Sequence, residues 1–196
     1  ATEEASLVCE FLADGAIGPV HEVRVWCPAR FWQWPSWEGR PPETAPAPDG
    51  LDWDRWLGPA PERPYHPAYC PWTWRNWWDF GNGRLGDMGC HIIDTPFQAL
   101  KLTAPLSIRA EVEPAWWNTT NRRSETWPTC QILHYTFAGN ELTADSALKF
   151  TWSDGGKYPP DELRQQIDNR EYPPQGSLLI GEAGALLLPH VAGPQL

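Results

Sequence analysis

The chain has 196 residues, 41% of them hydrophobic, and is long enough to bury a core of its own. Its formal net charge of −10 argues against nucleic acid and anionic membranes as partners, because both attract clustered lysine and arginine. No apolar run approaches the roughly 18 residues that a membrane-spanning helix needs. We therefore expect neither nucleic acid nor a membrane as a partner.

The first segment with a regular pattern, residues 2–14, places apolar side chains at helical spacing, and Gly15 follows as a stop. This pattern predicts a helix at the start of the chain. Residues 20–27, "VHEVRVWC", alternate β-branched and polar side chains. Such alternation predicts a strand directly after the helix.

Tryptophan and proline are concentrated in one part of the chain. Ten of the 14 tryptophans and eleven of the 22 prolines lie between Trp26 and Trp78. We expect a long loop over residues 28–72, interrupted by a short helix that Asp52 caps and Gly58 ends. Disorder does not suit so much tryptophan, so we expect this loop to lie over a functional site.

The second half of the chain changes from helical to alternating patterns. Residues 84–102 predict a helix that Pro96 kinks or breaks in two. Beyond it, a short capped helix is expected at 159–167, and strands are expected at 106–114, 129–139, 147–156 and, as a hairpin, 177–189. Consecutive strands with short connections favour an α+β fold, an open and mainly antiparallel sheet with helices on one face.

Three glycines, Gly81, Gly83 and Gly86, match the GxGxxG fingerprint of dinucleotide-binding loops. That fingerprint follows a buried strand and opens a crossover helix between parallel strands. Here the preceding residues are "WRNWWDF", and the chain continues into an antiparallel region. We therefore interpret the glycines as a close-packed entry into a helix, with no cofactor bound there.

Asp87 and His91 lie four residues apart and so share one face of the predicted helix. A carboxylate beside a histidine can orient the imidazole for proton transfer near neutral pH. A helix-capping aspartate and a structural histidine explain the same spacing equally well. The residues alone leave these two interpretations open.

Metal binding and disulfide bonding find little support in the sequence. His66, His91 and Asp94 could be brought together, but no HxxxH or HxH spacing supports a metal site. The five cysteines are scattered and contain no CxxC pair. This pattern favours buried free thiols over a disulfide framework.

Two stretches, "DGAIGPVHEVRVW" and "WWDFGNGRLGDMGCHIID", resemble the C-terminal domain of the Gfo/Idh/MocA oxidoreductase family, in its tryptophan-rich bacterial branch. The shared motif, G-x-L-x-D-x-G-x-H-x-x-D, runs from Gly83 to Asp94. The resemblance implies one substrate-binding and dimerisation domain over residues 1–196, without the Rossmann domain that binds NAD or NADP. It also implies that His91 transfers a proton and that Asp87 orients it or binds a neighbouring hydroxyl.

The family's E-K-P lysine belongs to the part that is missing, so the resemblance implies a fragment that is inactive in redox chemistry alone. The localisation stays unknown, because the resemblance to a bacterial branch leaves both the cytoplasm and the periplasm open. The resemblance also implies a homo-oligomer, formed through the sheet.

Tryptophan faces stack on sugar rings while charged side chains bind the hydroxyls, which favours a sugar or polyol as the ligand. In "YCPWTWRNWWDF", tryptophans alternate with polar residues in this way. We expect about half of these tryptophans to serve packing. The predicted substrate-binding residues in this stretch are Trp74, Arg75, Asn76, Trp77 and Asp79, and the resemblance adds Arg30, just after the first predicted strand.

Three functions therefore compete. The first is the substrate domain of an oxidoreductase acting on a sugar or polyol hydroxyl. The second is a hydrolase or lyase that uses Asp79, Asp87 and Asp94 with His91, which requires two carboxylates on either side of the scissile bond. The third is a non-catalytic module that binds carbohydrate and dimerises through the sheet.

Overall fold

The computed structural model describes residues 3–27 and 38–196. Its helices are α1 (Glu3–Ala13), α2 (Trp53–Leu57), α3 (Gly83–Ile92), α4 (Asp94–Ala99), α5 (Pro114–Trp117) and α6 (Thr120–Glu125), with 3₁₀ helices η2 (Thr73–Asn76) and η3 (Asp161–Ile167). Its strands are β1 (Val20–Cys27), β2 (Ser107–Val112), β3 (Gln131–Ala138), β4 (Ala147–Asp154), β5 (Gly176–Gly181) and β6 (Ala185–Pro189).

The strands form one open sheet in the order β2-β3-β4-β1-β5-β6. Four of the five neighbouring pairs are antiparallel, and the central pair, β1 with β4, is parallel. The predicted α+β fold with a mainly antiparallel sheet is therefore confirmed. The parallel pairing sets Cys27 opposite Asp154, so the C-terminal ends of β1 and β4 lie side by side.

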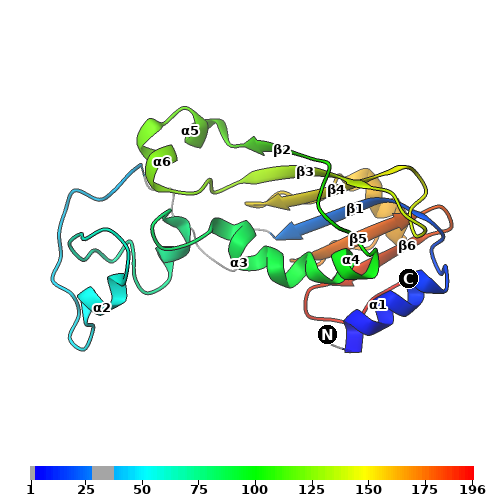
Figure 1. The fold of residues 1–196 in the computed structure, drawn as a ribbon, viewed down its shortest axis with the longest axis horizontal. Helices are drawn as coiled ribbons and strands as arrows, with labels where there is room; N and C mark the ends of the chain where they lie inside the picture. The colour runs from blue at the N-terminus through cyan, green and yellow to red at the C-terminus, as the bar shows by residue number, and fades with distance from the viewer. Residues whose placement is uncertain (1–2, 28–37) are drawn as a thin grey trace.

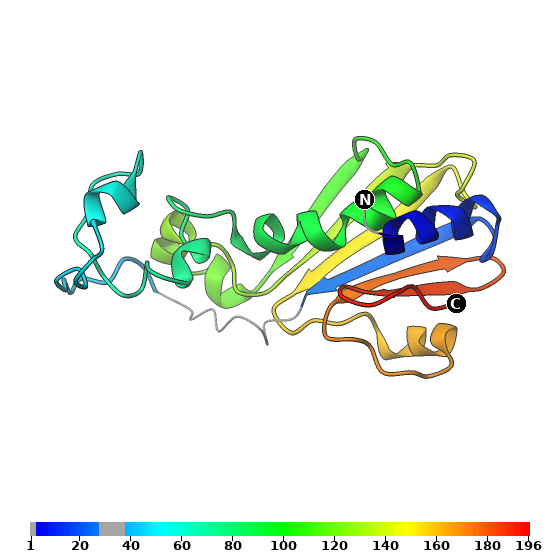
Figure 2. The same cartoon turned by 90° about the horizontal axis from the view of Figure 1, so that it is seen from below.

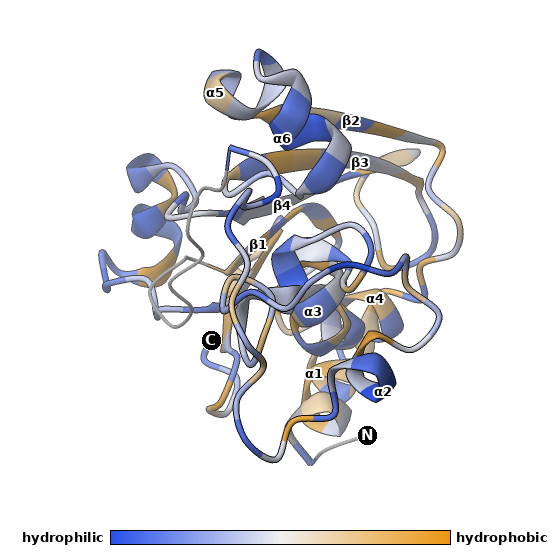
Figure 3. Ribbon diagram, turned by 90° about the vertical axis from the view of Figure 1, so that its left-hand side faces the viewer, coloured by the Kyte–Doolittle hydropathy of each residue, from blue (hydrophilic) through white to orange (hydrophobic). Residues whose placement is uncertain are grey.

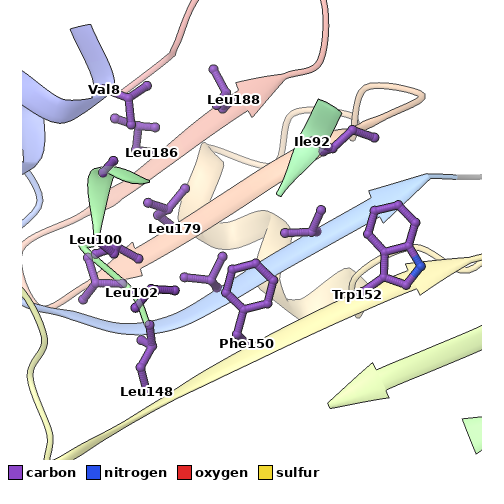
Figure 4. Close-up of a cluster of buried hydrophobic side chains, with 14 of the residues drawn as sticks. Val8, Ile92, Leu100, Leu102, Leu148, Phe150, Trp152, Leu179, Leu186 and Leu188 are labelled. Atoms are coloured by element: carbon purple, nitrogen blue, oxygen red, sulfur yellow. The ribbon is translucent and has the colours of Figure 1, made fainter. Parts of the chain in front are cut away.

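The main core lies between one face of the sheet and the helices α1, α3 and α4, which run across that face (Figures 1 and 2). Val8 of α1 and Ile92 of α3 reach down to the sheet, where Phe150 and Leu179 are almost fully buried (Figure 4). Each fully buried side chain of this kind contributes roughly 1.5–3 kcal/mol by leaving water. This packing places α3 along the sheet, with its polar side facing away.

A smaller cluster covers part of the opposite face. Ile167 of η3 packs there against Trp26 and Leu178, and the indole of Trp26 donates a hydrogen bond of 2.8 Å to the carbonyl of Pro173. The expectation of helices on one face is thus correct for α1, α3 and α4, while the 3₁₀ helix η3 lies on the other side (Figure 2). Figure 3 shows hydrophobic residues along β1 and β3 and hydrophilic ones on much of α6.

The helix predicted over residues 84–102 breaks in two near Pro96. Proline has no amide hydrogen, so Pro96 cannot donate to the carbonyl of Ile92. Ile93, whose own φ and ψ remain helical, ends α3 and precedes α4. The break lets α3 and α4 each follow the sheet, and α4 packs beside α1.

Residues 53–80 form a projection that we call the aromatic lobe. It lies at one end of the molecule, opposite α1 and both chain termini (Figure 1). Its own small core contains Tyr69 and Trp77, with Trp53, Trp56 and Phe80 packed against them. Backbone hydrogen bonds from Trp78 to Glu125 and from Trp127 to Asn76 fasten the lobe to the connection between α6 and β3.

Several local expectations need correction. The helices α5, α6 and η2 were not predicted, because each is too short to show a hydrophobic period. Residues 161–167 form a 3₁₀ helix without a side-chain cap, although a capped helix was predicted there. All five cysteines are free, as expected, but only Cys27 is buried, while Cys9 and Cys90 are exposed.

The other predicted elements are confirmed: α1, β1, β2, β3, β4 and the hairpin of β5 and β6 lie within about two residues of their expected places. Asp52 caps α2 as predicted, because its side chain accepts a hydrogen bond from the amide of Arg55. Within the described ranges, no helix is both long and apolar enough to cross a membrane.

Candidate functional site

His91 lies in the last turn of α3, and its position follows from how that helix packs. Met88 and Ile92 face the core and are buried, whereas Cys90 lies on the exposed side of the helix. His91 is likewise exposed. A helix that packs through one apolar stripe presents its polar side chains to solvent or to a pocket.

The pocket beside His91 has a volume of about 660 Å³, which is within the usual range for a small-molecule site. It is formed where the junction of α3 and α4 meets β5, the end of β6 and the segment after it. The polar or ionisable residues that line it are Cys90, His91, Asp94, Thr95, Ser177 and His190. Ser177 is fully buried, and its hydroxyl has no hydrogen-bond partner within residues 3–27 and 38–196.

His190 faces His91 across this pocket, with 6.0 Å between the two ring centroids. The backbone amide of His190 donates a hydrogen bond to the carbonyl of Gln175, which holds the segment after β6 in place. Burial lowers the pKa of His190, and the nearby His91 lowers it further. At neutral pH His190 is therefore a neutral imidazole that can donate or accept a hydrogen bond.

We expect the imidazole of His190 to titrate below the ordinary histidine pKa of about 6.5. Because the unfolded chain then takes up this proton first, His190 makes the folded chain less stable as the pH falls below about 6.5. Substituting His91→Ala removes one cause and should raise the pKa of His190 part of the way back. Proton NMR titration of the imidazole signals measures the pKa of His190 in the wild type and in His91→Ala. A wild-type midpoint for His190 at or above about 6.5 would contradict a buried His190 beside His91.

Asp87 does not contact His91 within the described parts of the chain. Its carboxylate instead accepts a hydrogen bond of 2.8 Å from Nε of Arg75, and both side chains are largely buried. The expectation that Asp87 orients His91 is therefore not met by this geometry. The pair joins η2 to α3, because Arg75 belongs to the aromatic lobe and Asp87 to the helix.

The predicted substrate-binding residues separate into groups. Trp77 and Asn76 are at most 1% exposed, and the indole of Trp77 bonds the carbonyl of Ala68. Both residues are packing residues in this structure, which corrects their assignment to a surface site. Trp74 and Asp79 line a second pocket, in the aromatic lobe and apart from His91. Arg30 lies outside the described residues.

The GxGxxG glycines pack against the chain itself. A Cβ atom at Gly83, whose φ is +64°, would lie 2.8 Å from the side chain of Trp127. At Gly81 it would lie 2.6 Å from the backbone of Arg75. The preceding element is the 3₁₀ helix η2 and no strand. These residues do not fit a dinucleotide-binding loop, and their glycines permit close internal packing, as predicted.

No group of three or more histidine, cysteine, aspartate or glutamate side chains suited to a metal ion occurs among the described residues. Sequence reasoning missed His190 and Ser177. His190 follows the last strand, and Ser177 is one position within β5. Neither residue belongs to a sequence motif that points to a pocket.

The fold is that of a C-terminal α/β domain of an oxidoreductase family. A family model described as the C-terminal alpha/beta domain of the Gfo/Idh/MocA oxidoreductase family matches residues 7–137. The chain therefore belongs to this family, as the motif from Gly83 to Asp94 predicted.

Solved structures with a similar fold are larger than this chain. A crystal structure of an NAD-binding protein from Listeria innocua is 13% identical, with a TM-score of 0.46 over 94% of this chain and 35% of its own. A super-repressor mutant of Gal80p from Saccharomyces cerevisiae is 12% identical, with a TM-score of 0.49 over 95% and 39%. The chain thus spans less than two fifths of either protein. None of the curated proteins matches it.

Proposed function

We propose that this chain is the substrate-binding domain of an oxidoreductase that acts on a hydroxyl group of a sugar or polyol. The observation that carries the proposal is the pocket of about 660 Å³ in which His91 lies beside His190 and whose lining includes Ser177. Imidazole and hydroxyl groups, which donate and accept hydrogen bonds, suit a ligand rich in hydroxyl groups. Membership of the oxidoreductase family supports the class of reaction.

In this proposal His91 handles the proton of the reacting hydroxyl. Oxidation of an alcohol to a carbonyl releases the hydroxyl proton, which an imidazole within hydrogen-bond reach can accept. His190, kept neutral by burial, would bind a neighbouring hydroxyl or the same one. NAD or NADP, the cofactor of the family, would be held outside this chain, because the glycine pattern here does not fit it.

A hydrolase or lyase with two catalytic carboxylates finds less support. Such a site needs two carboxyl groups on either side of one bond. Within the described residues only Asp94 lines the His91 pocket as an acid. Asp87 is paired with Arg75, and Asp79 lies in the aromatic lobe with Arg40 and Arg63.

Self-association through the sheet stays a prediction. The edge strand β2 exposes Ile108, and Leu106 before the strand and Trp117 in α5 after it are also at least 59% exposed. We propose that these apolar side chains contribute to the contact between copies of the chain. They lie away from the pocket of His91, so oligomerisation and substrate binding would use different surfaces.

The test is the substitution His91→Ala in a full-length protein that carries this chain. Losing a general base typically lowers kcat by about 10²–10⁴-fold. We expect this loss when oxidation of a panel of aldoses and polyols is measured with NAD⁺ and NADP⁺. The matched control is His21→Ala, a histidine exposed on β1 outside this pocket, which should leave kcat within about twofold. Undiminished turnover in His91→Ala, or no oxidation of any panel member by the wild type, refutes the proposal.

A further inference from the structure

A second pocket lies within the aromatic lobe, and its volume is about 260 Å³. Three aromatic residues and one carboxylate are among the residues that line it: Trp56, Leu57, Pro59, Ala60, Trp74, Asp79 and Phe80. We propose that this aromatic pocket binds one uncharged pyranose ring of a carbohydrate, independently of the pocket at His91. The inference goes beyond the proposed function, because it assigns binding without reaction to a different part of the chain.

The aromatic rings of the pocket are held in fixed planes before any ligand arrives. Trp56 stacks on Trp53, with ring centroids 4.9 Å apart and an interplanar angle of 13°, and meets Phe80 in an edge-to-face contact at 5.0 Å. The guanidinium of Arg75 covers the ring of Trp74 at 4.3 Å. Rings that are already ordered lose little conformational entropy when a ligand binds. The pocket therefore presents aromatic rings that are already ordered for stacking against a ligand.

Asp79 supplies the polar contact that a sugar requires. Arg63 and Arg40 both reach the same carboxylate oxygen, Oδ2. The other oxygen, Oδ1, carries no hydrogen bond within the described part of the chain and can accept one from a hydroxyl group. Aromatic faces together with one fixed carboxylate oxygen match a ring that has C–H groups on one side and hydroxyls around its rim.

The charges around the pocket decide between two ligands that aromatic pockets commonly bind. A quaternary ammonium ion also prefers aromatic faces beside a carboxylate. Here, however, Arg63 and Arg40 contact Asp79, Arg40 also pairs with Glu125, and Arg75 at Trp74 pairs with Asp87. Three guanidinium groups thus match three carboxylates, so the pocket has no excess negative charge for a cation to neutralise. The surroundings therefore favour an uncharged ligand with hydroxyl groups.

Size and position separate this pocket from that of His91. A volume of about 260 Å³ is below the usual 300–1,000 Å³ of drug-sized ligand sites, which suits a single ring. The aromatic lobe lies beyond the first turn of α3, whereas His91 lies in its last turn (Figure 1). A longer carbohydrate can therefore place one ring at Trp74 while its other rings lie outside this pocket.

The test follows the indole N–H signals of the ¹⁵N-labelled 196-residue chain by NMR. The chain is titrated separately with methyl β-D-glucopyranoside, methyl β-D-galactopyranoside, methyl α-D-mannopyranoside and choline chloride. We expect at least one glycoside to shift the Trp74 and Trp56 signals, and choline to leave them unchanged. Trp74→Ala should weaken glycoside binding at least about tenfold, because it removes one stacking face.

Two matched variants make the result specific. Trp72→Ala removes a neighbouring tryptophan that is 61% exposed and does not line the pocket, so glycoside binding should be unchanged. His91→Ala should also leave this binding unchanged, which separates the inference from the proposed function. If Trp74→Ala disturbs the indole signal of Trp77, which reports the lobe core, Trp74→Leu repeats the test with the volume largely kept.

Three results would overturn the inference. The first is that no glycoside shifts the pocket signals at concentrations up to the solubility limit. The second is that choline shifts them and the glycosides do not. The third is that Trp72→Ala or His91→Ala abolishes binding as completely as Trp74→Ala does.

Discussion

Substituting Arg84→Met should destabilise the chain by about 3–5 kcal/mol, because it removes one partner of a buried ion pair. Arg84, in the first turn of α3, is 2% exposed and lies 3.6 Å from the carboxylate of Asp154 at the end of β4. It also donates a hydrogen bond of 2.9 Å to the carbonyl of Thr129. In the variant the Asp154 carboxylate stays buried without its cation.

The pH dependence of this loss identifies its cause. Burial already raises the pKa of Asp154, while Arg84 and the hydrogen bonds from Trp152 and Gln131 act in the opposite direction. Without Arg84 the pKa rises further, so the folded variant holds a proton that the unfolded chain has released. Its stability therefore falls as the pH rises, and the loss should be smaller at about pH 5 than at about pH 8.

Urea unfolding at both pH values measures this effect. Arg109→Met is the control, because Arg109 is 67% exposed and its ion pair with Glu111 should contribute less than about 1 kcal/mol. The double substitution Arg84→Met with Asp154→Asn should recover part of the loss at about pH 8, since no charge is then left buried. A loss below about 1 kcal/mol in Arg84→Met, or one independent of pH, would show that this pair does not hold α3 on the sheet.

Substituting Trp77→Ala should cost about 3–5 kcal/mol, most of it within the aromatic lobe. Trp77 is fully buried, its ring meets Tyr69 edge-on at 4.9 Å, and its indole donates a hydrogen bond of 2.8 Å to the carbonyl of Ala68. The substitution leaves a cavity and removes one of two side-chain hydrogen bonds that the Ala68 carbonyl accepts, the other coming from the hydroxyl of Thr73. Because the lobe has its own small core, it should open before the sheet unfolds.

Limited proteolysis combined with urea unfolding separates the two events. In Trp77→Ala we expect faster cleavage between residues 53 and 80, with a smaller change in the unfolding of the sheet. Trp117→Ala serves as the comparison, since Trp117 is 60% exposed and should change stability by no more than about 0.5 kcal/mol. If cleavage within the lobe is as slow in Trp77→Ala as in the wild type, Trp77 is not the residue that holds the lobe together.

Much of the fold could be predicted from local patterns. Alternating residues marked the strands, Asp52 and Gly58 marked the ends of α2, and Pro96 marked a break between two helices. These signals are local, because backbone geometry and hydrogen-bonding capacity act within a few residues. The short helices α5, α6 and η2 gave no such signal, since tertiary contacts hold them more than their own sequence does.

The candidate site was only partly predictable. The motif from Gly83 to Asp94 pointed to His91, and the structure places that residue at a pocket. It also pointed to a contact between Asp87 and His91, yet Asp87 lies with Arg75, which belongs to the lobe. A spacing of four residues on a helix shows which side chains can meet. A side chain from another element, here Arg75, can still pair with one of them instead.

The sequence by itself determined the family, the α+β class and the histidine on α3, because each depends on a local motif or period. Only the tertiary structure decided that His190 and Ser177 join His91, that Trp77 is a packing residue and that Trp74 and Asp79 form a separate pocket. Those facts depend on contacts between residues far apart in the chain. Such contacts follow from how the helices pack on the sheet and leave no pattern at any one position.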